Sequence, residues 1–141
     1  MEEPKKKLVL IVEDEEDELE ILGIEFEKGG FRVRSAISGN KALHEISEEK
    51  PDLILLDILM PEMDGWEVLK RVRDDGDWGK KVPVIILTNT EVDTDEKQRQ
   101  IAQDEPAYFF VKTDFTIDQV LDKAKEVVMH ADSKTDTGSE N

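Results

Sequence analysis

Four short runs of apolar residues recur along this chain, and each is long enough for one buried β-strand. The runs occupy residues 8–12, 53–57, 84–88 and 107–111. Strands that are apolar at almost every position are typical of a parallel sheet covered on both faces, because neither face meets water. The segments between the runs carry apolar residues at the spacing of amphipathic helices. This pattern predicts an α/β fold built on a parallel sheet.

A fifth strand is expected at residues 31–36, where polar and apolar side chains alternate as they do at a sheet edge. The expected strands span about 8–12, 31–36, 53–57, 84–88 and 107–111, and the expected helices about 15–28, 39–49, 65–74, 94–103 and 116–129. The helix at 94–103 has few apolar residues, so we expect it to be mobile. We expect residues 75–81 to form an exposed loop.

The length of 141 residues suits one domain with a substantial core. We expect a folded domain at residues 1–129, followed at 130–141 by a disordered tail of small and polar residues.

Composition excludes several classes of function. The net charge of −16 argues against binding to nucleic acid or to anionic membrane surfaces. The absence of cysteine excludes disulfides, thiol catalysis and thiolate metal sites. No apolar stretch approaches the ~20 residues of a membrane span, and the first apolar run is too short for a signal peptide. A cytoplasmic protein is therefore expected.

Five polar residues follow the carboxyl ends of four predicted strands. Glu13 and Asp14 follow the first strand, Asp57 and Thr88 end the third and fourth, and Lys112 follows the fifth. In parallel sheets these ends share one edge, where ligands bind at the switch in strand order. Each residue alone has an ordinary explanation; Asp14, for example, could cap a helix. Their joint placement predicts a single polar site.

The residue types at this site favour phosphoryl transfer. Three carboxylates cannot all stay ionised side by side without a cation, and oxygen ligands suit Mg²⁺. Asp57 is a competent nucleophile toward phosphorus. Lys112 would pair with phosphoryl oxygens, and the Thr88 hydroxyl would donate a hydrogen bond to another oxygen.

This set of residues resembles the receiver domain of bacterial two-component response regulators, of the stand-alone, chemotaxis-regulator-like kind. The resemblance covers about residues 7–129 and rests on a set of residues in fixed order: Glu13, Asp14, Asp57, Met60, Pro61, Met63, Asp64, Gly65, Thr88 and Lys112. It implies a doubly wound, flavodoxin-like αβα fold with strand order 2-1-3-4-5. We also expect Asp64 to cap the helix at 65–74 and Gly65 to permit a close backbone approach.

The resemblance also implies roles for the site residues. Asp57 would be the phosphoacceptor, assisted by Lys112 and Thr88. Asp14, Asp57 and the backbone carbonyl of Leu59 would bind Mg²⁺ directly, and Glu13 would bind it through water. Such a protein is a phosphoacceptor that catalyses its own phosphorylation and dephosphorylation, not a conventional enzyme.

The same resemblance implies partners and a route for the signal. A sensor histidine kinase or a phosphotransfer protein would supply the phosphoryl group. Thr88 and Phe109 would then act as a switch that changes the surface formed by residues 94–103, 107–111 and 116–129. We expect a monomer whose signal leaves through a downstream protein, or through dimerisation on phosphorylation.

Three residues depart from the family pattern. Thr113 follows Lys112 where the family usually has proline, which predicts an altered loop. Asn89 stands where a smaller residue is usual, which predicts narrower access for phosphodonors. Leu59 has no polar group to orient an attacking water, which predicts a long-lived phosphoryl group.

Two other classes of function compete with this interpretation. An Asp-nucleophile phosphatase would need an Asp-x-Asp motif, and the second position is Leu59. A binding module would signal without phosphorylation, either as a degenerate receiver, which would lack Asp57 or Lys112, or as a flavin-binding domain. A flavin-binding domain would need a phosphate-binding loop after its first strand, where this chain has the acidic segment 13–16.

Overall fold

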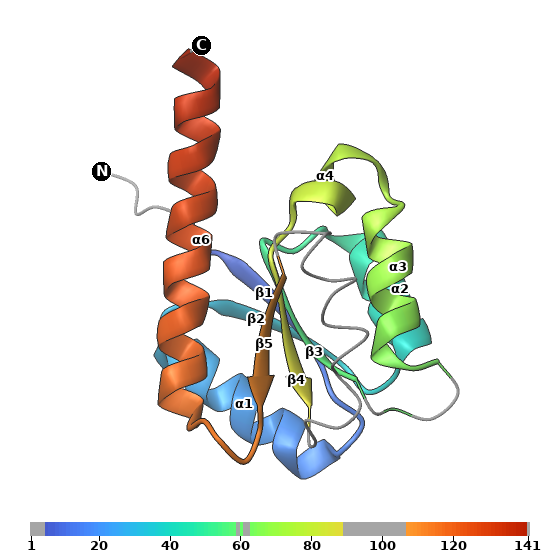
Figure 1. Ribbon diagram of the computed structural model, residues 1–141. Coiled ribbons are helices and arrows are strands. Elements are labelled where there is room, and N and C mark those ends of the chain that lie inside the picture. The colour runs from blue at the N-terminus through green and yellow to red at the C-terminus, as the bar shows by residue number, and fades with distance from the viewer. Residues whose placement is uncertain (1–4, 59, 61–62, 89–106, 141) are drawn as a thin grey trace.

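The computed structural model describes residues 5–58, 60, 63–88 and 107–140 (Figure 1). The strands form one parallel sheet of five, in the order β2-β1-β3-β4-β5, as predicted. The strands are β1 (Leu8–Val12), β2 (Arg32–Ala36), β3 (Leu53–Asp57), β4 (Val84–Thr88) and β5 (Ala107–Val111). The predicted helix at 94–103, together with Leu59 and Asn89, lies outside the described residues.

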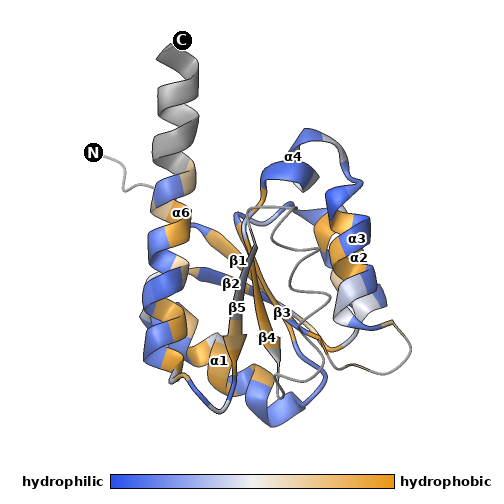
Figure 2. Cartoon of the chain, viewed as in Figure 1, coloured by the Kyte–Doolittle hydropathy of each residue, from blue (hydrophilic) through white to orange (hydrophobic). Residues whose placement is uncertain are grey.

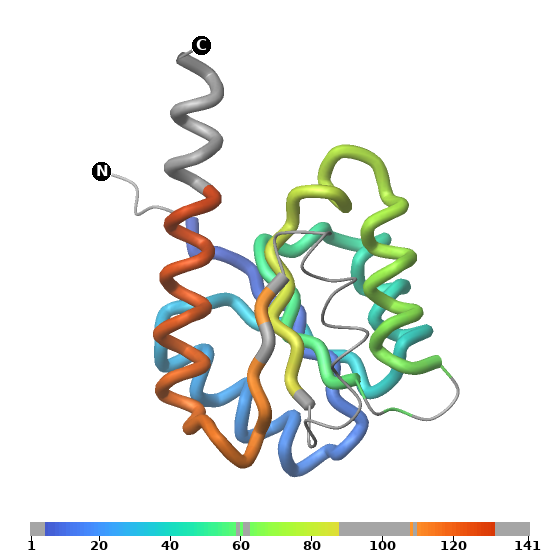
Figure 3. Tube along the Cα trace, viewed as in Figure 1, coloured from blue at the N-terminus to red at the C-terminus, as the bar shows by residue number. Residues whose placement is uncertain are grey.

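Helices cover both faces of this sheet. They are α1 (Glu16–Lys28), α2 (Gly39–Glu48), α3 (Gly65–Arg73), α4 (Gly76–Lys81) and α6 (Ile117–Glu140). α1 and α6 lie on one face, and α2 and α3 lie on the other, which gives the predicted three layers (Figure 1). The Cα trace winds from β1 outward to β2, then returns across β1 to β3 and continues to β4 and β5 (Figure 3).

Two apolar cores lie on the two sides of the sheet. Alternate residues of β1 enter different cores: Leu10 and Val12 pack on the side of α2 and α3, and Val9 and Ile11 on the side of α1 and α6. Successive side chains of a strand point to opposite faces, so a strand covered on both faces needs apolar residues throughout. Figure 2 shows the apolar strands between helices whose outer surfaces are hydrophilic.

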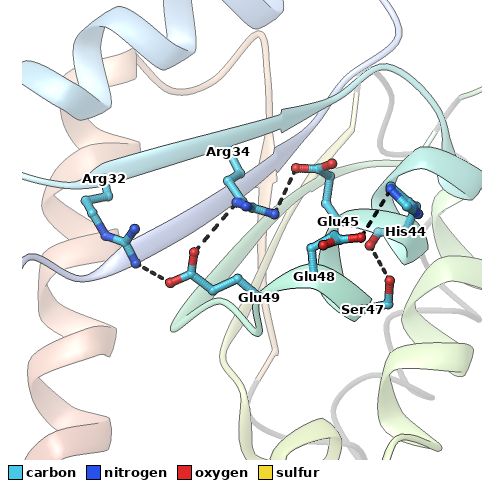
Figure 4. Close-up of polar contacts among 7 residues, drawn as sticks. All are labelled: Arg32, Arg34, His44, Glu45, Ser47, Glu48 and Glu49. Atoms are coloured by element: carbon cyan, nitrogen blue, oxygen red, sulfur yellow. Dashed lines mark hydrogen bonds and ion pairs between the residues drawn. The ribbon is translucent and has the colours of Figure 1, made fainter.

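The edge strand β2 is held to α2 by ion pairs between two arginines and two glutamates (Figure 4). Arg34 Nη1 lies 3.2 Å from Glu45 Oε1, and Arg34 Nε lies 3.7 Å from Glu49 Oε1. Arg32 pairs with the other oxygen of Glu49. Charged side chains on an edge strand discourage pairing with another chain. The alternation that predicted an edge strand therefore also supplies these contacts.

The segment at 75–81 is not the exposed loop that we expected, because it contains the short helix α4. The indole Nε1 of Trp78 donates a hydrogen bond to the carbonyl of Pro51 over 2.9 Å. Arg73 Nη1 donates to the carbonyl of Val82 over 2.7 Å. Trp78 also packs against the core beside α2 and α3. These tertiary contacts hold a segment whose glycines and charges favour a loop.

The last helix is longer than the expected span of 116–129, because α6 continues to Glu140. No proline occurs after Pro106 and the first glycine of this stretch is Gly138, so backbone hydrogen bonding meets no strong helix breaker before that position. Residues 132–140 are small and polar in the main, and α6 extends past the sheet in Figure 1. Among the described helices none is long and apolar enough to cross a membrane.

Two glycines give a matched test of this packing. A Cβ at Gly65 would lie 2.5 Å from the carbonyl oxygen of Asp57, whereas a Cβ at Gly23 would lie 3.8 Å from Val33. We expect Gly65→Ala to destabilise the fold by about 1–3 kcal/mol, because backbone must move. We expect Gly23→Ala, inside α1, to stabilise it by about 0.5–1 kcal/mol. Urea unfolding measures both, and a Gly65→Ala variant as stable as wild type would contradict the close approach.

Candidate functional site

The site is built at the carboxyl ends of β1 and β3, which are neighbours in the sheet. Val12 pairs with Leu56, so Glu13 comes directly after β1 beside Asp57, the last residue of β3. One carboxylate oxygen from each of Glu13, Asp14 and Asp57 lies within 4.8 Å of the other two. The structure therefore brings together the three carboxylates that the sequence placed at this edge.

Two of these carboxylates are almost inaccessible to solvent. Glu13 is 1% exposed and Asp57 is 3% exposed, whereas Asp14 is half-buried. The backbone holds Glu13 at both ends: its N–H donates to the carbonyl of Ala36 over 3.0 Å, and its Oε1 accepts from the N–H of Glu15 over 3.2 Å. Charged groups are rarely buried unless they are paired, so the site needs cations.

Lys112 provides one cation from the far side of the site. Thr88, at the end of β4, pairs with Val111, and Lys112 is the next residue after β5. Its Nζ lies 2.9 Å from Glu13 Oε2, 3.0 Å from Glu18 Oε1 and 3.9 Å from Asp57 Oδ1. Burial opposes the charged form of this lysine, but its contacts with Glu13, Glu18 and Asp57 prevail, so the pKa of Lys112 is raised.

The charges at the site do not balance. Burial raises the pKa of Glu13 above its usual range, and the hydrogen bond from Lys112 offsets only part of this effect. Among the described residues, the carboxylates of Glu13, Glu18 and Asp57 lie within 3.9 Å of the Lys112 ammonium group, and that of Asp14 lies close to those of Glu13 and Asp57. A divalent cation held among Glu13, Asp14 and Asp57 would relieve the repulsion between these carboxylates. An all-oxygen donor set of this size suits Mg²⁺.

The loop after β3 is anchored against the site. The N–H of Gly65 donates to the carbonyl of Ile58 over 3.0 Å, and Met60 is buried. Asp64 caps α3 by accepting from the N–H of Glu67 over 3.0 Å. The predicted cap at Asp64 and the predicted close approach at Gly65 are both confirmed. These contacts keep the backbone around Asp57 in place.

The remaining predicted residues are located by the backbone alone or not at all. Thr88 ends β4, and Phe109 lies in β5 opposite Ile86. Their positions in the sheet agree with the predicted strands, whereas Leu59 lies outside the described residues.

Sequence reasoning missed one contributor to the site, Glu18. Glu18 ends an acidic run that begins at Glu13, and a helix whose first turn favours negative charge is a sufficient explanation for such a residue. The sequence carried no local signal for this contact, because Glu18 and Lys112 lie far apart along the chain and meet only in the folded sheet.

The chain also matches a known protein family. A family model described as the response regulator receiver domain matches residues 9–125. The chain belongs to the response regulator receiver domain family. In this family, phosphorylation on aspartate and a Mg²⁺ site in an acidic pocket are general features, and members interact with histidine kinases or phosphotransfer proteins. Receiver domains as a family accept phosphoryl groups and are not conventional enzymes.

Individual relatives agree with this assignment. The receiver domain is 37% identical over 90 residues to the alkaline phosphatase synthesis transcriptional regulatory protein PhoP of Bacillus subtilis, a match that covers 64% of this chain and 36% of that protein. The chemotaxis protein CheY4 of Vibrio cholerae superimposes with a TM-score of 0.78 at 26% identity, over 87% of this chain and 99% of that one. The receiver domain of the Francisella response regulator 1452 gives 0.77 at 26% identity, over 89% and 98%.

The charge imbalance at the site predicts opposite effects of one substitution. Asp57→Asn removes a buried like charge, so we expect it to stabilise the metal-free protein by about 1 kcal/mol. It also removes a candidate ligand, so the stabilisation by Mg²⁺, about 2.7 kcal/mol at a hundredfold excess over Kd for wild type, should shrink strongly. Thermal unfolding with and without Mg²⁺ measures both effects.

Asp122→Asn is the matched control, because Asp122 is an exposed carboxylate on α6. The control should keep the wild-type response to Mg²⁺. An Asp57→Asn variant that is less stable than wild type without metal, yet fully stabilised by Mg²⁺, would contradict this description of the site.

Proposed function

We propose that this receiver domain accepts a phosphoryl group on Asp57 from a phosphohistidine of a sensor histidine kinase or phosphotransfer protein. One observation carries the proposal: Asp57 is a buried carboxylate that lies close to two further carboxylates and 3.9 Å from the ammonium group of Lys112. A carboxylate so placed has both a candidate cation site and a positively charged side chain beside it. Phosphoryl transfer depends mainly on such positioning and neutralisation.

The transfer step is a displacement at phosphorus. An oxygen of Asp57 attacks, the new O–P bond forms, and the P–N bond breaks with its electron pair going to the imidazole nitrogen. Asp14, Asp57 and the carbonyl of Leu59 would hold Mg²⁺ directly and Glu13 would hold it through water. When bound, the ion neutralises charge on the phosphoryl oxygens. Lys112 pairs with one of these oxygens, and the Thr88 hydroxyl donates to another.

Hydrolysis ends the phosphorylated state. A water molecule attacks phosphorus, the O–P bond breaks, and Asp57 returns to a carboxylate as inorganic phosphate leaves. Leu59 offers no hydrogen bond to that water, so the phosphoryl group should be comparatively long-lived.

The variant Leu59→Asn should shorten the lifetime of the phosphoryl group. The loss of phosphorylated protein, followed by mass over time, measures this lifetime. An unchanged lifetime would contradict this role.

The signal would pass from the site to a protein surface. Thr88 ends β4, and Phe109 lies in β5, the strand that Lys112 follows. These two residues would be the switch. Their change would bias the surface of residues 94–103, β5 and α6 between two arrangements. A downstream protein contact, or a second copy of the chain, would read that surface. PhoP is by its name a transcriptional regulator. A transcriptional output would depend on the same change at Thr88 and Phe109.

Intact-protein mass after incubation with acetyl phosphate and Mg²⁺ tests the proposal. We expect one added phosphoryl group in wild type and in Asp122→Asn, and none in Asp57→Asn or after chelation of the metal. An adduct that persists in Asp57→Asn would contradict the assignment. A wild-type protein that takes up no phosphoryl group, from this donor or from a phosphorylated histidine protein, would favour the alternative of a receiver-like module that binds its partner without phosphorylation.

A further inference from the structure

Glu18 contacts Lys112 but does not belong to the group of carboxylates that could share a cation. Among the described residues, the carboxylates that could share a cation are those of Glu13, Asp14 and Asp57. Glu18 lies in the first turn of α1, and its side chain is 34% exposed, whereas that of Lys112 is 14% exposed. This carboxylate therefore approaches the lysine from the solvent side of the site.

The ammonium group of Lys112 is closer to Glu18 than to Asp57. The distance from Nζ is 3.0 Å to Glu18 Oε1 and 3.9 Å to Asp57 Oδ1. The first distance is that of a charge-assisted hydrogen bond, and the second is too long for one. In the state described here, Lys112 is thus occupied by Glu13 and Glu18, and its interaction with Asp57 is weaker.

We infer that Glu18 is a positioning residue that holds Lys112 in a resting place, which the lysine must leave when Asp57 is phosphorylated. The inference rests on the proposed function, in which Lys112 pairs with a phosphoryl oxygen. Forming that pair requires the contact with Glu18 to weaken. Once freed, the Glu18 carboxylate faces the newly added anionic group. Glu18 therefore opposes phosphorylation in two ways, by holding Lys112 and by repelling the phosphoryl group.

Glu18 should have the opposite effect on the metal. Lys112 and a divalent cation at Glu13, Asp14 and Asp57 repel each other, and Glu18 offsets the charge of the lysine. Removing the charge of Glu18 would leave that repulsion uncompensated. One substitution is therefore expected to weaken Mg²⁺ binding and to speed phosphorylation, a pair of effects that general damage to the fold would not produce.

The test compares Glu18→Gln with Glu20→Gln, which removes the same charge from an exposed position on the same helix. Calorimetry would measure the Kd for Mg²⁺, and intact mass would measure the rate of phosphorylation by acetyl phosphate at saturating Mg²⁺. For Glu18→Gln we expect the Kd to rise roughly threefold to tenfold and the rate to rise by a similar factor. Glu20→Gln should change each by less than about twofold.

Two results would overturn the inference while leaving the proposed function intact: a phosphorylation rate in Glu18→Gln equal to that of wild type, or changes of equal size in Glu20→Gln. A fall in both Mg²⁺ affinity and phosphorylation rate would indicate a merely structural role and would also overturn it. A wild-type protein that takes up no phosphoryl group would overturn the proposed function, and this inference with it.

Discussion

Repulsion among buried carboxylates is the constraint on which the rest of this structure depends. Glu13 and Asp57 are almost fully buried, and each has a carboxylate oxygen within 4.8 Å of the other and of one from Asp14. Such an arrangement is unfavourable unless cations compensate it. Lys112 compensates part of it, and the remaining negative charge would favour a divalent cation among these carboxylates.

The fold provides the rigidity that this arrangement needs. β1 and β3 are covered on both faces, and their register sets Glu13 beside Asp57. Gly65 packs against the backbone at Asp57, and β5 brings Lys112 to the same edge. Acidic groups on flexible loops would move apart to reduce their repulsion, whereas these are held by strands buried in two cores. The buried strands therefore hold these carboxylates close together despite their repulsion.

Much of this could be predicted from the sequence, for identifiable reasons. Continuous apolar runs set the strands, and alternation in 31–36 placed β2 at the edge; these patterns are local and strong. The convergence of the carboxylates followed from the parallel order. The helix α4 depends on the hydrogen bond between Trp78 and Pro51, which lie far apart in sequence. The length of α6 and the contact of Glu18 with Lys112 also depend on features that charge or composition alone does not reveal.

A crystal structure with Mg²⁺ and beryllofluoride, which mimics a phosphoryl group on a carboxylate, would test the central claim most directly. We expect the beryllium group on Asp57, the metal between Asp14 and Asp57, and the ammonium of Lys112 bonded to a fluoride and withdrawn from Glu18. A beryllofluoride bound elsewhere, or a Lys112 that keeps its present distances to Glu13 and Glu18 while Asp57 carries the group, would contradict the account.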